Sequence, residues 1–183
     1  YLSYNAPHTP LQATERDLER NNHIEIEKRR TYAAMVSSMD DGIGLILDKL
    51  EEKKISDNTI VIFFSDNGGV EWYNFSDNGV LRGIKGDFFE GGIRVPFTMQ
   101  WPKKIKPGTT YDRPIIALDV FATVASAASA EKYLKNEIDG VDLLPYITGK
   151  KSSLPHEYLY WKNPDKDIDV VRDERYKYLR IKD

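Results

Sequence analysis

The hydrophobic pattern in the first third of the chain predicts one long helix and a buried strand. Apolar residues recur every three or four positions between residues 24 and 53, notably from Tyr32 to Leu50. This spacing places them on one stripe of an amphipathic helix. Residues 59–64 (TIVIFF) then form an unbroken run of β-branched and aromatic residues. Such a run is typical of a strand covered on both faces, so we expect residues 59–64 in the centre of an α/β sheet.

The rest of the chain predicts shorter elements. Residues 1–5 alternate weakly before Pro7, which predicts a short strand, whereas the charged residues 14–22 receive no assignment. A further strand is expected over 96–101. Short helices are expected over 120–128 and 140–147, and three aromatic-rich strands over 157–161, 169–172 and 176–181. The pattern as a whole predicts a mixed α/β sheet flanked by helices, followed by a small antiparallel sheet.

Composition and charge narrow the classes of partner. The 183 residues are 40% hydrophobic and 30% charged, with 26 basic and 29 acidic side chains and a net charge of −3. A nucleic-acid-binding surface would require an excess of basic residues, so we expect no nucleic-acid partner. No apolar run approaches the roughly 18 residues of a membrane span, so we expect no membrane partner. The chain has no cysteine, which excludes disulfides and thiolate chemistry.

The strand over 59–64 ends at Asp66-Asn67, which two glycines follow. Ligands of open α/β sheets bind just beyond the carboxyl ends of the strands. A carboxylate and an amide oxygen at this place suit a hard cation such as Ca²⁺ or Mg²⁺, although Ca²⁺ takes about six to eight oxygen ligands in all. The sequence Asp-Asn-Gly is also common in turns that bind nothing. Both interpretations of Asp66 and Asn67 stay open on these residues alone.

Two further side chains have the chemistry to contact an anion. Lys85 lies between Gly83 and Gly86, where a flexible backbone allows close approach to an anion. The plain alternative is a solvated loop lysine. His8 lies between Pro7 and Pro10, which stiffen its turn. It is either an ordinary surface histidine, or a hydrogen-bond donor to an anionic oxygen or a general acid.

Residues 66–95 form a long loop with seven glycines, and a loop of that length is typically functional. It contains the aromatic residues Trp72, Tyr73 and Phe75. These rings either stack on a sugar or aryl ring of a substrate, or pack the loop onto the domain, and packing is slightly favoured.

Six segments, in order along the chain, resemble the sulfatase family, a branch of the alkaline-phosphatase-like superfamily. They are NAPHTPLQA, AAMVSSMDDGIGLILDKL, TIVIFFSDNGG, LRGIKGDFFEGGIRVPF, DGVDLLPYITGK and VVRDERYKYLR. The resemblance extends over nearly all 183 residues. It implies that residues 1–130 are the C-terminal part of a catalytic α/β domain with an alkaline-phosphatase-like mixed sheet. Residues 131–183 are implied to form a C-terminal subdomain of short antiparallel strands.

The resemblance also implies roles for individual residues. Asp66 and Asn67 are implied to be two ligands of the active-site divalent cation, usually Ca²⁺. Lys85 is implied to bind the sulfate oxygens, and His8 to lie near the sulfate ester and its leaving oxygen. The implied activity is that of a sulfuric ester hydrolase, with a sulfated small molecule or glycan as substrate.

The sequence departs from the family pattern in one important respect. Family members carry an early Cys or Ser in a C/S-x-P-x-R motif that becomes formylglycine, an early Asp pair, and a further Lys and His. The chain begins at Tyr1 after these features. We therefore expect the C-terminal portion of a longer enzyme, inactive by itself, whose cation site is completed by the upstream half of its catalytic domain. The resemblance alone suggests a periplasmic or extracellular location.

Two other functions stay open. A phosphate or phosphonate ester hydrolase of the same superfamily would act on a tetrahedral group of the same geometry, so fold alone does not decide. A non-catalytic binding module would retain this half of the site for glycan contact or assembly.

Overall fold

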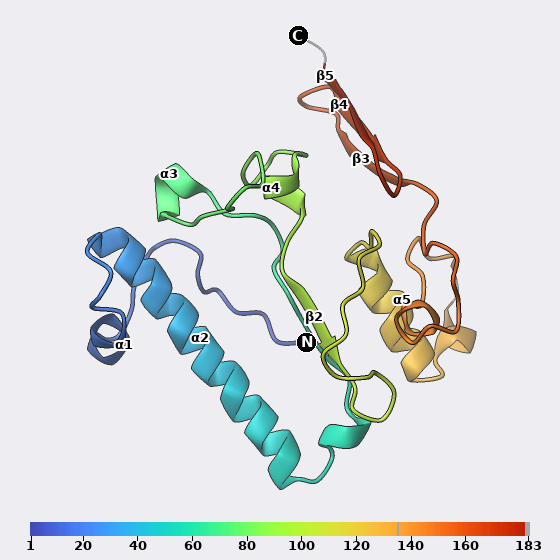
Figure 1. The fold of residues 1–183 in the computed structure, drawn as a ribbon, viewed down its shortest axis with the longest axis horizontal. Coiled ribbons are helices and arrows are strands. Elements are labelled where there is room, and N and C mark those ends of the chain that lie inside the picture. Colours follow the sequence, from blue (N-terminus) through green and yellow to red (C-terminus); the bar gives the residue numbers. More distant parts are fainter. Residues whose placement is uncertain (135, 182–183) are drawn as a thin grey trace. The chain divides into compact units, whose positions relative to one another are not determined.

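The computed structural model describes residues 1–134 and 136–181 (Figure 1). The chain divides into two compact units, Tyr1–Lys103 and Lys104–Asp183. The first unit holds a two-stranded sheet and the second a three-stranded sheet. This confirms a mixed α/β protein with small antiparallel sheets. Among the described residues, no helix has both the length and the apolarity needed to cross a bilayer.

The first unit alternates helices with its two strands. In chain order its elements are α1 (Glu15–Arg20), α2 (Glu27–Glu52), the 3₁₀ helix η1 (Ser56–Asn58), β1 (Val61–Phe64), α3 (Glu71–Asn74), α4 (Glu90–Ile93) and β2 (Phe97–Gln100).

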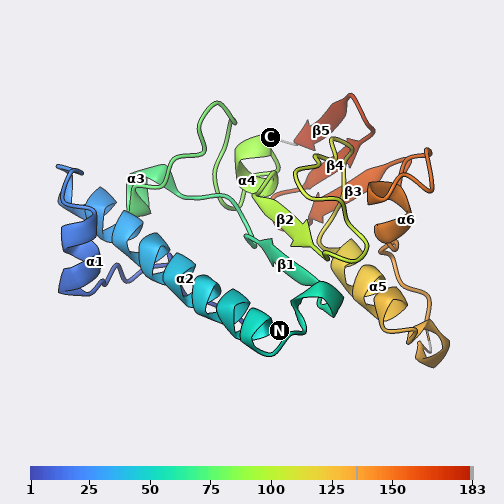
Figure 2. The same ribbon diagram turned by 60° about the horizontal axis from the view of Figure 1, so that its bottom comes forward.

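The long helix α2 confirms the helix predicted over residues 24–53 (Figure 2). Its residues Ala34 and Met35 are buried, as the apolar stripe requires. At Gly42 the absence of a side chain admits Tyr4, because a Cβ there would lie 2.9 Å from the Tyr4 hydroxyl oxygen. The strand predicted over residues 1–5 is wrong. This segment is irregular and contacts α2 through Tyr4, and it pairs with no strand of the described chain.

Strands β1 and β2 pair antiparallel, with Phe64 opposite Phe97 and their ring centroids 5.9 Å apart. The strands predicted over 59–64 and 96–101 are confirmed. The central position predicted for β1 is not found in the part of the chain that the structure describes, where β2 is its one paired neighbour. Phe63 accordingly stays 36% exposed. An apolar run of this kind is typical of a strand on which other elements pack from both faces. In the described part of the chain, β1 is covered only in part.

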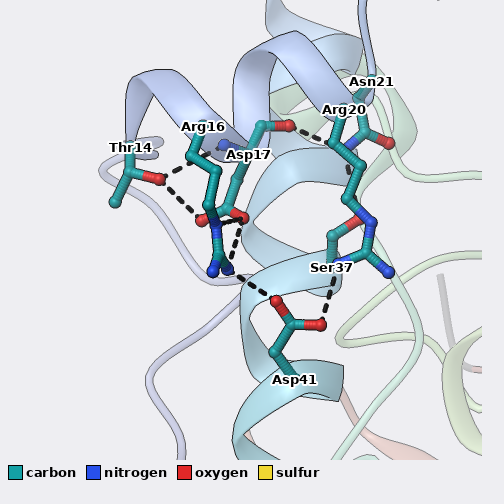
Figure 3. Close-up of polar contacts among 7 residues, drawn as sticks. All are labelled: Thr14, Arg16, Asp17, Arg20, Asn21, Ser37 and Asp41. Carbon is teal, nitrogen blue, oxygen red and sulfur yellow. Dashed lines mark hydrogen bonds and ion pairs between the residues drawn. The ribbon is translucent and has the colours of Figure 1, made fainter.

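Helix α1 forms where the hydrophobic pattern gave no assignment, because a polar cap starts it (Figure 3). The Thr14 hydroxyl accepts a hydrogen bond from the Asp17 backbone N–H (3.2 Å) and donates one to the Asp17 carboxylate (2.7 Å). The amide of Asn21 donates to the Asp17 carbonyl oxygen (2.8 Å) and to the Ser37 hydroxyl of α2 (3.1 Å). The Thr-x-x-Asp spacing is a helix-start signal that the sequence does contain.

Ion pairs between charged side chains also connect α1 to α2 (Figure 3). Arg16 lies 3.0 Å from the Asp17 carboxylate and 2.6 Å from the Asp41 carboxylate of α2. Arg20 contacts the other oxygen of Asp41 at 2.8 Å. Exposed ion pairs are individually weak, but here two arginines share one carboxylate, and Asp17 is almost fully buried.

These contacts lower two carboxyl pKa values. The hydrogen bond from Thr14, and after it that from Arg16, lowers the pKa of Asp17. The hydrogen bond from Arg20 lowers the pKa of Asp41. Both carboxylates thus have a lower pKa in the folded than in the unfolded chain. Their contribution to stability is complete above the unfolded value of about 3.9 and is lost as the pH falls through the folded values.

Acidic pH is therefore expected to reduce the difference in stability between the wild-type protein and an Asp41→Asn variant. At neutral pH the variant lacks the carboxylate that both arginines contact, so it should unfold at a lower temperature than the wild-type protein. This difference in melting temperature should be constant near neutral pH and should shrink as the pH falls below about 4, because the unfolded chain, in which Asp41 has the higher pKa, then binds more protons than the folded chain. A difference that stays constant down to about pH 3 would contradict the assignment.

The second unit confirms the predicted short helices and the three C-terminal strands. Its elements are α5 (Leu118–Ala127), the 3₁₀ helix η2 (Glu131–Tyr133), α6 (Leu144–Ile147), β3 (Leu159–Asn163), β4 (Ile168–Arg172) and β5 (Lys177–Ile181). The strands pair antiparallel in the order β3-β4-β5. One face buries Leu159 and Val170, and the opposite face carries the exposed Tyr160 and Tyr178.

One buried carboxylate joins three segments of the second unit. Asp119 of α5 accepts hydrogen bonds from the backbone N–H groups of Ile116 and Val141, both at 2.9 Å, and lies 2.8 Å from Nε2 of His156. A fully buried carboxylate needs such partners, so this group is structural. The domain boundary at residue 130 is not tested by these contacts and stays a prediction.

Candidate functional site

The candidate site begins where β1 ends. Asp66 is exposed and Asn67 is half-buried. The Ser65 hydroxyl donates to the Asn67 carbonyl oxygen (2.8 Å), and the Ser65 N–H donates to the Pro96 carbonyl oxygen (3.2 Å). The Asn67 side-chain N–H group donates to the Gly68 carbonyl oxygen (2.9 Å), so an approaching cation would meet the amide oxygen. This turn thus holds a carboxylate and an amide oxygen next to each other at the strand end.

Close backbone packing explains the glycines around this turn. The Gly68 N–H donates to the Gly92 carbonyl oxygen (2.9 Å), and a Cβ at Gly68 would lie 1.7 Å from the Gly91 carbonyl oxygen. A Cβ at Gly91 would in turn lie 2.1 Å from the Gly83 carbonyl oxygen. Three separate stretches of the loop therefore meet at distances that only glycine permits.

The same packing brings Lys85 to the strand end. Its backbone N–H donates to the carbonyl oxygen of Gly69 (3.2 Å), two residues after Asn67. Gly83 and Gly86, on either side, both have positive φ values, 92° and 90°. The Lys85 side chain is exposed, as an anion-binding lysine and a solvated lysine both would be. The structure thus places the backbone of Lys85 next to the Asp66-Asn67 turn, and its role stays a prediction.

Asn78 holds this arrangement together, and the hydrophobic pattern gave no sign of it. Its side-chain oxygen accepts from the Gly69 N–H (2.9 Å), and its side-chain nitrogen donates to the carbonyl oxygens of Gly69 (3.1 Å) and Gly83 (3.2 Å). The Asn78 side-chain amide therefore links the Asp66-Asn67 turn to the segment before Lys85. A signal did exist, because Ser76-Asp77-Asn78-Gly79 repeats the tetrad that begins at Ser65.

Replacing Asn78 with alanine should loosen the loop. The variant loses three hydrogen bonds and leaves the Gly69 N–H without its partner, which should cost about 2 kcal/mol in the free energy of unfolding. Hydrogen exchange at the Gly69 and Lys85 amides should become faster. The matched variant Asn22→Ala removes one exposed hydrogen bond and should change stability by less than about 0.5 kcal/mol. Unchanged hydrogen exchange at these two amides in the Asn78→Ala variant would contradict the conclusion that the Asn78 side chain holds the loop together.

His8 lies in the first unit but forms its own local turn. Its backbone N–H donates to the Asn5 carbonyl oxygen (2.8 Å), and its Nδ1 lies 2.7 Å from the Thr9 carbonyl oxygen. The side chain is exposed. These contacts do not join His8 to the loop that carries Asp66 and Lys85, so its predicted role as a general acid stays untested.

The donor set for a cation is partial in this chain. Among residues 1–134 and 136–181, no three His, Cys, Asp or Glu side chains gather closely enough to hold a metal ion. The chemistry of Asp66 and Asn67 still fits a hard cation, since both offer oxygen ligands. Because Ca²⁺ takes about six to eight oxygen ligands, these two side chains would form only part of such a site.

The aromatic residues of the loop differ in how they are packed. Phe75 packs towards α2: its carbonyl oxygen accepts from Arg29 (2.6 Å), and the Lys28 ammonium lies 5.8 Å from its ring centroid. The packing interpretation is therefore confirmed for Phe75. Trp72 and Tyr73, both in α3, are 75% and 55% exposed and contact each other edge to face. Within the described part of the chain, these two rings therefore stay largely uncovered.

Family models match both halves of the chain. Residues 1–130 match the model described as Sulfatase, and residues 85–182 match the model described as N-sulphoglucosamine sulphohydrolase, C-terminal.

Curated relatives give the same result over most of the chain. Over 162 residues the chain is 37% identical to the uncharacterized sulfatase YdeN of Escherichia coli K12, covering 88% of this chain and 29% of YdeN. Over 166 residues it is 35% identical to human steryl-sulfatase, covering 87% of this chain and 27% of that protein. The chain thus spans less than a third of the length of these relatives.

Solved structures show the same similarity in three dimensions. The structure of Ps i-CgsB in complex with k-i-k-neocarrahexaose matches 99% of this chain and 40% of that chain, with a TM-score of 0.87 and 35% identity. The phosphonate monoester hydrolase SpPMH from Silicibacter pomeroyi matches 84% of this chain and 32% of that chain, with a TM-score of 0.66 and 20% identity. The second similarity shows the fold alone.

Proposed function

The chain belongs to the sulfatase family, and we propose that it supplies the cation-binding and sulfate-binding half of an active site that hydrolyses sulfate esters. One observation carries the proposal. The loop packs the backbone of Lys85 against Gly69, directly after the oxygen donors Asp66 and Asn67. The Lys85 ammonium group and a cation bound at the same strand end would together suit an oxyanion such as a sulfate group.

Each residue has a distinct task in this mechanism. Asp66 and Asn67 would hold the cation, usually Ca²⁺ in this family, which would supply positive charge opposite the sulfate oxygens. Lys85 donates hydrogen bonds to a non-bridging sulfate oxygen and stabilises the charge that develops there. His8 donates a proton to the leaving alcohol oxygen. The nucleophile, a formylglycine, is contributed by residues outside these 183, so the chain alone is inactive.

An upstream half of the catalytic domain would also account for the exposure of strand β1. β1 is apolar along its length, has one paired neighbour here and leaves Phe63 36% exposed. We propose that the upstream half of the domain pairs with its other edge and completes an alkaline-phosphatase-like sheet over residues 1–130. Residues 131–183 then form the C-terminal subdomain.

The substrate is a carbohydrate or aryl sulfate. The neocarrahexaose complex of Ps i-CgsB supports the carbohydrate class, and the similarity to steryl-sulfatase supports substrates with a non-carbohydrate ring system. The fold-level similarity to a phosphonate monoester hydrolase keeps phosphorus esters as the competing class.

Turnover by the full-length enzyme tests the proposal. The panel should include 4-nitrophenyl sulfate, sulfated oligosaccharides such as sulfated neocarrahexaose, 4-nitrophenyl phosphate and a phenylphosphonate monoester. We expect release of sulfate, with a kcat/KM for the best sulfate ester well above that for any phosphorus ester. Faster turnover of a phosphorus ester would favour the phosphohydrolase. Glycan binding without turnover of any ester would favour the non-catalytic module.

A further inference from the structure

Helix α3 presents an aromatic surface that the proposed chemistry does not use. Trp72 is 75% and Tyr73 is 55% exposed, with ring centroids 5.6 Å apart at an interplanar angle of 61°. Val80, in the same loop, is fully exposed. Large aromatic rings that stay exposed next to a candidate active site are typical of ligand-binding surfaces. A ring without such a role would stabilise the fold more if it were buried.

This surface lies close to the sulfate-binding half of the site. Trp72 follows Gly69 by three residues, so their Cα atoms are at most about 11 Å apart. The carbonyl oxygen of Gly69 contacts the Lys85 N–H. A second sugar residue of a bound chain would therefore be within reach of Trp72 while the first holds its sulfate near Lys85.

Several contacts hold α3 in a fixed position. The Glu71 carboxylate accepts from the Asn78 N–H (3.2 Å), so α3 is tied to the residue that clamps the loop. At its other end Phe75 adopts a left-handed conformation, with φ of 61°, and its carbonyl oxygen accepts from Arg29 of α2. A rigid support of this kind lowers the entropic cost of stacking a ligand on the rings.

Positive charge lies at the end of α3 that carries Phe75, three residues after Trp72. The exposed Lys28 of α2 lies over the Phe75 ring, and Arg29 contacts the Phe75 backbone, so both cationic groups lie at the base of α3. Two acidic residues lie at this end of the two helices, Glu27 in the first turn of α2 and Glu71 in α3, and Glu71 is bonded to the loop, while the other acidic residues of α2 lie from Asp40 onward. Aromatic rings next to an ammonium group suit a ligand with a flat apolar face and an anionic substituent, which describes a sulfated sugar.

Resting on the proposed sulfatase function, we infer that α3 forms a subsite for a second sugar of a sulfated glycan, stacked on Trp72 with its own sulfate near Lys28. The full-length enzyme therefore acts on saccharide chains with sulfates on neighbouring residues. A substrate with one ring and one sulfate fills only the part of the site near Asp66 and Lys85.

Kinetics of Trp72→Ala in the full-length enzyme test the subsite. We expect kcat/KM for the best sulfated oligosaccharide of the panel to fall about tenfold more than kcat/KM for 4-nitrophenyl sulfate, the scale of one stacked ring. The control Tyr178→Ala, which removes a 66% exposed ring from β5, should change neither value. Equal losses on both substrates, or no loss on the oligosaccharide, would overturn the inference.

Lys28→Gln tests the charge. Its effect on kcat/KM should be several times larger for an oligosaccharide with a second sulfate than for the same oligosaccharide with only the sulfate that is hydrolysed. An effect independent of the second sulfate would overturn the assignment of Lys28. A wild-type enzyme that hydrolyses aryl sulfates but no saccharide sulfate would overturn the subsite while leaving the sulfatase function intact. An enzyme that hydrolyses no sulfate ester would refute the proposed function itself.

Discussion

Lys85→Ala is expected to lower kcat/KM for sulfate ester hydrolysis by about a thousandfold in the full-length enzyme. In the proposed mechanism the lysine donates to a sulfate oxygen on which negative charge increases as the ester bond breaks. Removal of one such preorganised donor costs transition-state stabilisation rather than folding. The side chain is exposed, and the loop is held by the Lys85 backbone N–H and by Asn78, so the variant should fold normally.

The matched control is Lys103→Ala, since Lys103 is also exposed in the first unit but lies outside the loop. Initial rates with 4-nitrophenyl sulfate should be unchanged in this variant. Lys85→Arg should recover only part of the activity, because a guanidinium keeps the charge but not the compact shape of an ammonium group. A Lys85→Ala enzyme with wild-type kcat/KM would show that Lys85 is an ordinary solvated lysine.

Asp66→Ala is the second substitution with a large expected effect. It removes the carboxylate that we propose as a ligand of the cation, so both cation affinity and kcat/KM should fall by at least about a hundredfold. Activity should return in part at high Ca²⁺ concentration, because the remaining ligands, Asn67 among them, still bind weakly.

The sequence provides a close control in its second Ser-Asp-Asn-Gly tetrad. Asp77 is exposed, and its carboxylate accepts from the Gly79 N–H (2.7 Å), as in an ordinary turn. Asp77→Ala should therefore leave metal content and kcat/KM unchanged. Equal effects of the two substitutions would mean that Asp66 also only shapes a turn.

The long-range pattern of the sequence predicted the regular elements well. The apolar stripe of α2 and the three aromatic-rich runs of β3 to β5 are both confirmed. Short elements were harder. Helix α1 has no apolar stripe, and its stability comes from the Thr14 cap and from ion pairs with Asp41.

The predictions that failed depended on neighbours that the hydrophobic pattern does not show. Residues 1–5 have weak alternation, but a strand forms only where another strand pairs with it. β1 has the sequence of a central strand, yet has one paired neighbour among the described residues. Both segments show that a local pattern gives the preference of a segment, whereas its position depends on the rest of the fold.

The roles of the candidate site residues stay predictions, and the contacts that hold these residues in place could not be read from the sequence. The resemblance selected Asp66, Asn67, Lys85 and His8, and the structure brings the first three onto one loop. The sequence did not reveal that Asn78 joins the two parts of that loop. Such a contact depends on the precise approach of backbone groups, for which the sequence carries only the repeated tetrad as a sign.

Titration calorimetry with Ca²⁺ on the full-length enzyme tests the central claim most directly, with wild-type, Asp66→Ala and Asp77→Ala proteins compared. The account predicts tight binding of Ca²⁺ by the wild-type and Asp77→Ala proteins, and a loss of affinity of at least about a hundredfold in Asp66→Ala. The 183-residue chain alone should bind weakly, because two oxygen donors are too few. Wild-type affinity in Asp66→Ala would contradict the account, since Asp66-Asn67 would then be a turn that binds no metal.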